Sequence, residues 1–208
     1  MVWRDGRVAE GARLESVYRG NLIEGSNPSL SATPPIGGCT SKTDKDLMND
    51  DVIALHDAHH DRLHDHVFGL LEALVDVDTH RARVVFKTLC DELETGLRLE
   101  DDVVIPIYKT QPLRSPQGRA DHVEGDHVIL RRTIAAIDAW LDELGASPTR
   151  RRVLAGLPVV YRLLGTLEHH HEREKLHLYP VVAPLLEGAL LDETLAVLRR
   201  LVAGDARP

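Results

Sequence analysis

The stretch 167–180, LEHHHEREKLHLYP, combines three consecutive histidines with several acids and ends in a proline. A histidine run by itself is usually a solvated surface feature. However, His170 and Glu174 are four residues apart, so on a helix both side chains project from the same face. Apolar residues continue this face at the same spacing on either side, at Leu163, Leu167, Leu178 and Val181. The stretch therefore predicts a helix with two ligand-type residues inside an otherwise apolar stripe, and such residues need partners elsewhere in the chain.

Composition favours a helical protein with one domain, with or without a tail. Of its 208 residues, 43% are hydrophobic and only 4% are aromatic, which favours an aliphatic helical core. The formal charge of −8 disfavours nucleic acid as a partner, since phosphate binding needs clustered Lys and Arg. Two cysteines fit a reducing compartment, and no apolar run approaches the roughly 20 residues of a membrane span. We therefore expect a cytoplasmic protein without a membrane partner.

Residues 1–47 differ in composition from the rest of the chain. They contain Gly-Ser-Asn-Pro at 25–28, further prolines and glycines at 34–38, and no sustained apolar periodicity. The run VAEGARLESVYRGNLIEGSNPSLSA resembles the translation of a serine tRNA gene, which predicts a spurious extension with Met48 as the true start. The alternative is a genuine disordered tail. Both interpretations leave residues 48–204 as the functional domain.

Apolar residues recur every three or four positions along four long segments, which begin near residues 50, 82, 120 and 158. A further short helix is expected at about 192–203. Ser147 and Pro148 predict an N-cap followed by proline at the first helical position, and Gly156 and Pro158 predict an interruption before the fourth main helix. Short loops between long amphipathic helices predict an all-α fold, an up-down antiparallel four-helix bundle with a short C-terminal fifth helix.

Five polar residues interrupt the apolar stripes of these helices. Burying such groups unpaired costs several kcal/mol, so they need a shared partner. Counting from the helix ends puts them within about one turn of the same height along the bundle. Imidazole suits iron, zinc or copper, and a carboxylate can bridge two metals. The sequence therefore predicts one metal-binding layer made of His60, Glu100, His127, His170 and Glu174.

This arrangement resembles the hemerythrin-like proteins, the HHE cation-binding domains, over about residues 50–185. Their four helices carry in turn a histidine, HxxxE, a histidine and HxxxE, and each HxxxE is usually followed by a proline ten residues after its histidine. The stretch that begins at His170 matches the second HxxxE, and Glu100 with Pro106 marks the first. The single histidines of the first and third helices correspond to His60 and His127.

One position departs from the family pattern. Gly96 stands four residues before Glu100, where the family has histidine, so the constellation is one imidazole short. Three interpretations are open: His56 or His64, each four residues from His60, substitutes for the missing ligand; water or an exogenous ligand fills the position; or the site has degenerated to one metal or none. Glycine inside a helix costs about 1 kcal/mol relative to alanine, so another group is expected to occupy the space.

The remaining polar residues receive more ordinary interpretations. His171 lies at the stripe edge, where it would support the ligands, and His177 would line the pocket or cap its end. Asp57, Asp61 and Asp65 recur every four residues, which is typical of a solvated helix edge. Cys90 is interpreted as a small core or boundary residue. We expect surface positions for His66, His80, His122 and His169.

The resemblance implies a non-heme di-iron centre that binds or reduces O₂, NO or peroxide, with Glu100 and Glu174 bridging the irons. Whether it is an enzyme that reduces peroxide or O₂ is open, and the missing histidine would favour redox turnover over reversible carriage. One alternative is a storage or mononuclear module that holds zinc, manganese or iron at His127, His170 and Glu174. Another is a bundle with a degenerate metal site that acts in protein interaction. Monomer and homo-oligomer are both open.

Overall fold

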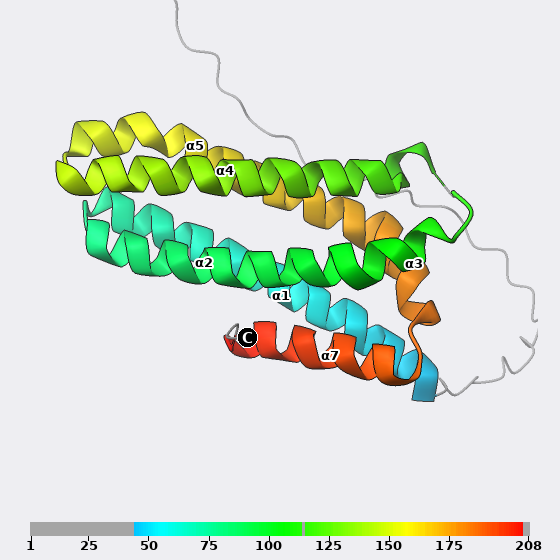
Figure 1. Cartoon of the computed structure of the whole chain (residues 1–208). Coiled ribbons are helices and arrows are strands. Elements are labelled where there is room, and N and C mark those ends of the chain that lie inside the picture. The colour runs from blue at the N-terminus through cyan, green and yellow to red at the C-terminus, as the bar shows by residue number, and fades with distance from the viewer. Residues whose placement is uncertain (1–43, 114, 206–208) are drawn as a thin grey trace, which may run out of the picture. The chain divides into compact units, whose positions relative to one another are not determined.

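The computed structural model describes residues 44–113 and 115–205, and within these ranges all regular secondary structure is helical. The all-α prediction is confirmed. The longest helices are α1 (Asp44–Val75), α2 (Thr79–Leu99), α4 (Ala120–Ala146), α5 (Arg150–Arg173) and α7 (Gly188–Ala203) (Figure 1). The proposed N-terminal extension lies outside the described residues except for its last four, which belong to α1.

Shorter helical segments connect the long helices. The π-helical segment η1 (Glu100–Val104) and α3 (Ile105–Lys109) follow α2, and the 3₁₀ turn η2 (Pro116–Gly118) precedes α4. A second π-helical segment, η3 (Glu174–Leu178), extends α5. The helix α6 (Tyr179–Val182) and the 3₁₀ turn η4 (Ala183–Leu185) then lead to α7.

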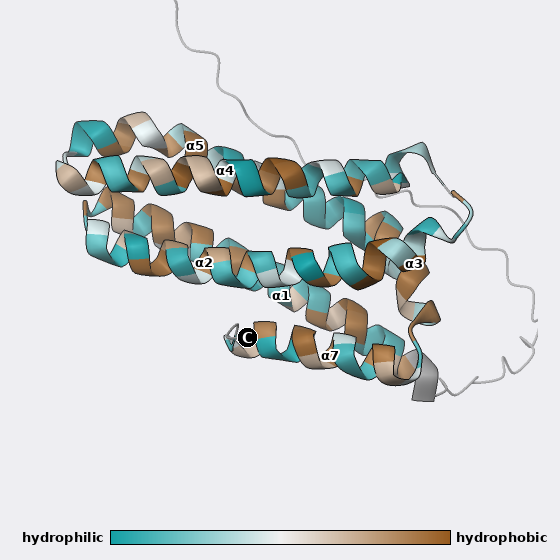
Figure 2. Ribbon diagram, in the orientation of Figure 1, coloured by the Kyte–Doolittle hydropathy of each residue, from teal (hydrophilic) through white to brown (hydrophobic). Residues whose placement is uncertain are grey.

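The four longest helices form two pairs that pack against each other. Helix α1 lies against α2, and α4 lies against α5 (Figure 1). Contacts of α1 with α5 and of α2 with α4 join the pairs, while α7 packs on α1 and α2. Figure 2 shows hydrophobic and hydrophilic residues interspersed along each helix, as expected for amphipathic helices that bury one face.

Two apolar clusters lie at different heights along these helices, with a polar layer between them. One cluster includes Leu63, Leu97, Leu130 and Leu167, and the other includes Val52, Val104, Val123 and Leu178. Along the chain, each predicted ligand lies between a member of one cluster and a member of the other: His60 between Val52 and Leu63, Glu100 between Leu97 and Val104, His127 between Val123 and Leu130, and His170 and Glu174 between Leu167 and Leu178. Apolar side chains therefore pack on both sides of the polar layer.

Helix α5 differs from its prediction in two respects. It runs unbroken from Arg150 to Arg173 with Pro158 inside it, so the expected restart near Pro158 is wrong. Pro158 and Leu154 are both exposed, and water can therefore satisfy the Leu154 carbonyl, which loses its helical partner. Gly156 allows close packing of Trp140. A Cβ at this position would lie 2.0 Å from Cε2 of Trp140, so the indole can approach the helix only because glycine has no Cβ.

The start of α5 also corrects the capping prediction. Ser147 ends α4, and Thr149 is the N-cap of α5, since its hydroxyl accepts a hydrogen bond of 3.3 Å from the Arg152 backbone N–H. Thr149 has the extended backbone of an N-cap, one residue after the proline. Helix α7 begins at Gly188, a few residues before the predicted boundary.

The two π-helical segments begin at the two glutamates that were predicted as ligands. Pro106 and Pro180 stand six residues after Glu100 and Glu174, and a proline ring clashes with the carbonyl four residues before it. The backbone N–H groups of Ile105 and Tyr179 bond instead to the carbonyls five residues back, at Glu100 and Glu174. Such wide turns inside α-helices are frequent at functional sites. They were not predicted from the sequence.

Candidate metal centre

Six buried side chains from five helical segments meet in the polar layer between the apolar clusters. Helix α1 supplies His56 and His60, and α4 supplies His127. The two carboxylates stand at the first positions of η1 and η3, and the last residue comes from α5. None of the six is more than 3% exposed: His56, His60, Glu100, His127, His170 and Glu174.

The six residues form two groups of four that share both carboxylates. One group consists of His56 and His60 with the two glutamates, and the other of His127 and His170 with the same glutamates. Within each group the potential donor atoms lie within 4.8 Å of one another. Two donor groups joined by two carboxylates have the form of a dinuclear site.

The individual contacts show how the carboxylates connect the two groups. Oε2 of Glu174 lies 3.1 Å from Nε2 of His56 and 3.3 Å from Nε2 of both His60 and His170. Glu100 uses its two oxygens differently. Its Oε1 lies 3.9 Å from Nε2 of His56, whereas its Oε2 lies 3.3 Å from Nε2 of His127 and 3.7 Å from Nε2 of His170. Each carboxylate thus faces imidazoles of both groups.

Many polar atoms of this layer are buried and have no hydrogen-bond partner among the described residues. They include Oε2 of Glu100, Oε1 of Glu174, Nε2 of His127 and both ring nitrogens of His170. Each unsatisfied buried polar atom costs about 1–3 kcal/mol, so their concentration in one layer calls for an explanation. Carboxylate oxygens and unprotonated imidazole nitrogens all bind cations, and the residues therefore fit a metal centre.

Burial disfavours the charged forms of the ionisable groups in this layer. Burial, together with the charge of Glu100, raises the pKa of Glu174 well above its ordinary value. Burial also opposes ionisation of Glu100, but the neighbouring His127 and His170 outweigh it and lower that pKa to about 2. Burial lowers the pKa of His60 well below its ordinary value and that of His170 to about 3. These imidazoles are therefore neutral at pH 7, with lone pairs free for a cation.

A family model described as the Hemerythrin HHE cation binding domain matches residues 51–180. The chain belongs to this family. Its resemblance to the family is confirmed, and membership implies that the chain binds cations. No curated protein and no solved structure matches the chain. In the part of the chain that the structure describes, no helix has the length and apolar character needed to cross a membrane.

Carboxylate and hydroxyl groups orient the candidate ligands of this HHE domain. Nδ1 of His127 donates a hydrogen bond of 2.7 Å to Asp101, which also accepts one of 2.9 Å from Arg131. Because Nδ1 carries the proton, Nε2 of His127 points its lone pair toward the centre. The hydroxyl of Tyr179 donates to Glu100 at 3.4 Å, and its ring packs on His56 with centroids 3.8 Å apart.

On the opposite side of the HHE domain's centre, Asp57 joins α1 to α5. It accepts hydrogen bonds from Nε2 of His171 at 3.0 Å and from Lys175 at 2.7 Å, and it lies 3.7 Å from Nδ1 of His56. The expectation that Asp57 belongs to a solvated edge is therefore wrong, although Asp61 and Asp65 are exposed. His171 stacks on His60, with centroids 4.2 Å apart and ring planes 7° apart.

The structure distinguishes between the two histidines considered as substitutes at position 96. His56 belongs to one of the donor groups, whereas His64, one turn beyond His60 on the other side, belongs to neither. The space above Gly96 is filled by a different residue. A Cβ at Gly96 would lie only 2.6 Å from Cε1 of His59, whose imidazole packs directly on the glycine backbone.

Sequence reasoning missed a second buried polar cluster, between α1 and α2. Glu92 is fully buried and accepts hydrogen bonds from Arg62 at 2.9 and 2.8 Å and from Nε2 of His66 at 3.0 Å. His66 was expected at the surface but is partly buried by this contact. A signal was present, since Glu92 falls three residues after Leu89 and four before Gly96 on the apolar face of α2.

The other histidines lie away from the centre. As expected, His80, His122 and His169 are exposed. The last two line a surface pocket of about 400 Å³ together with partly buried His177. None of these residues belongs to either donor group.

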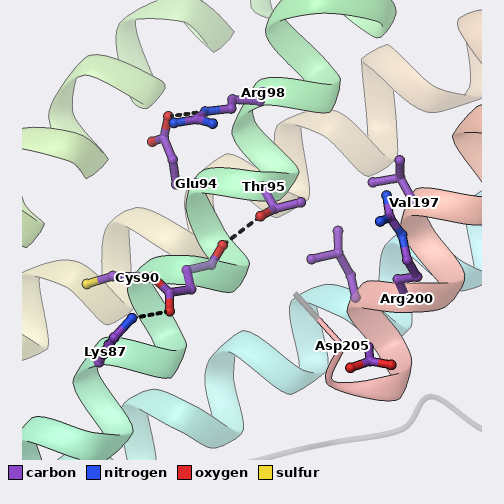
Figure 3. A pocket seen from close by; sticks show the side chains of 10 residues that line it. Lys87, Cys90, Glu94, Thr95, Arg98, Val197, Arg200 and Asp205 are labelled. Atoms are coloured by element: carbon purple, nitrogen blue, oxygen red, sulfur yellow. Dashed lines mark hydrogen bonds and ion pairs between the residues drawn. The ribbon is translucent and has the colours of Figure 1, made fainter. Parts of the chain in front are cut away.

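A groove of about 530 Å³ between α2 and α7 is separate from the candidate centre. On its α2 side, Lys87 pairs with Asp91 at 2.6 Å, and Arg98 pairs with Glu94 at 3.1 Å, the latter pair visible in Figure 3. Cys90, at the edge of the groove, is partly buried, and burial raises its pKa to about 12. None of the six candidate ligands lines this groove.

Proposed function

We propose that this HHE domain holds a non-heme di-iron centre that binds a small ligand such as O₂, NO or peroxide. The supporting observation is the pair of donor groups that share Glu100 and Glu174. In this proposal His56 and His60 hold one iron, His127 and His170 hold the other, and both carboxylates bridge. His56 thereby supplies the imidazole that Gly96 lacks.

The proposal includes the predicted up-down arrangement of the four-helix bundle. An up-down antiparallel order of α1, α2, α4 and α5 brings one ligand segment from each helix to the same height. The apolar clusters on both sides limit the access of bulk water, which favours small, uncharged or weakly solvated ligands. Iron supplies open coordination positions and one-electron redox changes when it is bound.

The protein's own residues would hold and orient the ligands. Asp101 keeps the proton of His127 on Nδ1, so that Nε2 remains available. Tyr179 donates to Glu100 at the oxygen that faces α1. Asp57 and His171 brace α1 against α5 beside His56 and His60. These contacts fix ring orientations before a metal arrives, which lowers the cost of assembling the site.

A mononuclear or storage site at His127, His170 and Glu174 is the main alternative. It is less well supported, because the group containing His56 and His60 is as deeply buried and as compact as the group containing His127 and His170. A degenerate site that acts only in protein interaction would leave both groups of unpaired buried atoms without a function.

Metal content and optical spectra test the proposal. The purified chain is loaded anaerobically with Fe(II), desalted and exposed to air. Two irons per chain and the charge-transfer bands of an oxo-bridged pair are expected. One iron or none, with a colourless protein, would rule out the dinuclear centre.

A further inference from the structure

Asp57 and His171 form a third cluster of potential metal ligands together with His56, where α1 packs against α5. One potential donor atom of each residue lies within 4.8 Å of the other two. The closest contacts are made by Oδ1 of Asp57, which lies 3.0 Å from Nε2 of His171 and 3.7 Å from Nδ1 of His56. His56 is fully buried, whereas the side chains of Asp57 and His171 are 28% and 17% exposed. The cluster therefore lies between the buried centre and solvent.

The two ring nitrogens of His56 face different groups. Nε2 lies 3.1 Å from Oε2 of Glu174 in the centre. Nδ1 is buried and has no hydrogen-bond partner among the described residues, since its distance of 3.7 Å to Asp57 is too long for a hydrogen bond. A buried nitrogen without a partner is costly, so Nδ1 calls for a group that the protein atoms do not supply. An iron bound at Nε2 would not provide it.

The spacing of these atoms suits a tetrahedral cation. Zinc binds imidazole nitrogens at about 2.0–2.1 Å and carboxylate oxygens at about 2.0–2.2 Å, which places neighbouring ligand atoms about 3.3 Å apart. The contacts of 3.0 and 3.7 Å made by Oδ1 of Asp57 lie on either side of this value. Two imidazoles and one carboxylate, with a fourth position open to water, are a common donor set for zinc. Lys175 bonds to the other oxygen of Asp57, Oδ2, at 2.7 Å and so leaves Oδ1 for a cation.

We propose that Nδ1 of His56, Oδ1 of Asp57 and Nε2 of His171 bind a divalent transition-metal cation such as zinc, and we call these three residues the outer site. The cation replaces the hydrogen bond between His171 and Asp57, and the proton of His171 moves to its Nδ1. His56 releases its ring proton to solvent when both of its nitrogens bind metal.

The outer site goes beyond the proposed di-iron function, which uses only Nε2 of His56. Iron fills the buried groups first, because each of them offers four donors and the outer site offers three. A cation at the outer site also fixes the ring of His56, the imidazole that replaces the one missing at Gly96.

The test titrates the iron-loaded, air-oxidised full chain with Zn(II) in competition with a chromophoric chelator, and iron is measured in the same samples. We expect the wild type to bind one zinc per chain in addition to its iron. His171→Phe keeps a flat ring to stack on His60 but has no nitrogen, so it should weaken zinc binding at least about tenfold. The control His169→Phe, at the exposed neighbouring position, should change zinc affinity less than about twofold.

A second variant tests the charge at the outer site. Lys175 is exposed and pairs with Asp57, so its positive charge opposes a cation there. Lys175→Gln should therefore strengthen zinc binding about two- to fivefold, the effect of one exposed ion pair. Unchanged or weaker zinc binding in this variant would contradict the assignment of Asp57 as a ligand.

Zinc crystallography of the wild type keeps the inference falsifiable if the variants fold poorly. Crystals soaked in Zn(II) should show an anomalous peak at the zinc edge between Asp57 and His171, and no peak there would overturn the inference. It would also be overturned if the wild type bound no zinc beyond its iron, or if His171→Phe bound zinc as tightly as the wild type. If the wild type holds fewer than two irons but still binds a zinc that depends on His171, the proposed di-iron function fails and the outer site stands.

Discussion

The close approach of His59 to Gly96 predicts an unusual response to a normally stabilising substitution. Replacing glycine by alanine inside a helix usually stabilises it by about 1 kcal/mol. At Gly96, however, the new Cβ would lie 2.6 Å from Cε1 of His59, well inside the roughly 3.5–4.0 Å of a favourable carbon contact. His59 is buried, so its ring cannot move away freely.

Overpacking of this kind costs about 1–3 kcal/mol, which cancels or exceeds the gain in helix propensity. We therefore expect Gly96→Ala to destabilise the wild type by about 0–2 kcal/mol. In a His59→Ala background the clash is gone, and the same substitution should stabilise by about 1 kcal/mol. The coupling between the two positions is then about 1–3 kcal/mol, well above the error of a double-mutant cycle.

Urea unfolding of the metal-free protein, followed by circular dichroism, measures all four proteins of this cycle. Gly165→Ala is the matched control, since Gly165 is also inside a helix but no atom lies within 4 Å of its missing Cβ. It should stabilise the protein by about 1 kcal/mol whether or not His59 is present. If Gly96→Ala stabilises the wild type as much as Gly165→Ala does, the packing of His59 on Gly96 is refuted.

Three further predictions concern Glu174, the second polar cluster and the cysteine. Glu174→Gln should reduce iron content below about one per chain, because both groups share this residue, while exposed Glu172→Gln should leave it unchanged in the same metal analysis. Glu92→Gln should lower the free energy of unfolding by about 2–4 kcal/mol, since it removes the charge partner of Arg62 and His66 in a buried cluster. The control Glu72→Gln, on the exposed surface, should lower the free energy of unfolding by less than about 0.5 kcal/mol. Equal effects of the two substitutions in urea unfolding would contradict this prediction. Because burial raises the pKa of Cys90 to about 12, its thiol is almost fully protonated at about pH 8 and gains reactivity only as the pH rises further. Iodoacetamide should therefore alkylate Cys90 at least about 100-fold more slowly in the native than in the unfolded protein. Comparable rates would refute the raised pKa of this thiol.

The sequence was sufficient for the helical class and for most of the candidate ligands, for a physical reason. Helical periodicity places His170 and Glu174 on one face without any knowledge of the tertiary structure. The same local rule selects Glu100 and His127, because each lies in line with apolar residues on its own helix. The family match over residues 51–180 supports this interpretation. Assignment of these residues as metal ligands stays a prediction.

The sequence could not decide between His56 and His64 as the extra imidazole. Both lie on the same face of α1, one turn to either side of His60, and they differ only in height. That height depends on how α1 packs against α2 and α5, including the contacts of Glu92 with Arg62, which no local pattern encodes. Local rules also failed at Gly156 for a tertiary reason, since the packing of Trp140 requires a glycine there and the helix continues through it.

The number of irons bound by His56 and His64 variants tests the central claim most directly. Anaerobic titration with Fe(II) should give two irons per chain for the wild type and for His64→Ala, because His64 lies outside both donor groups. His56→Ala should retain only the iron held by His127 and His170. If the wild type binds fewer than two irons, or if His56→Ala still binds two with unchanged affinity, the centre proposed here is contradicted.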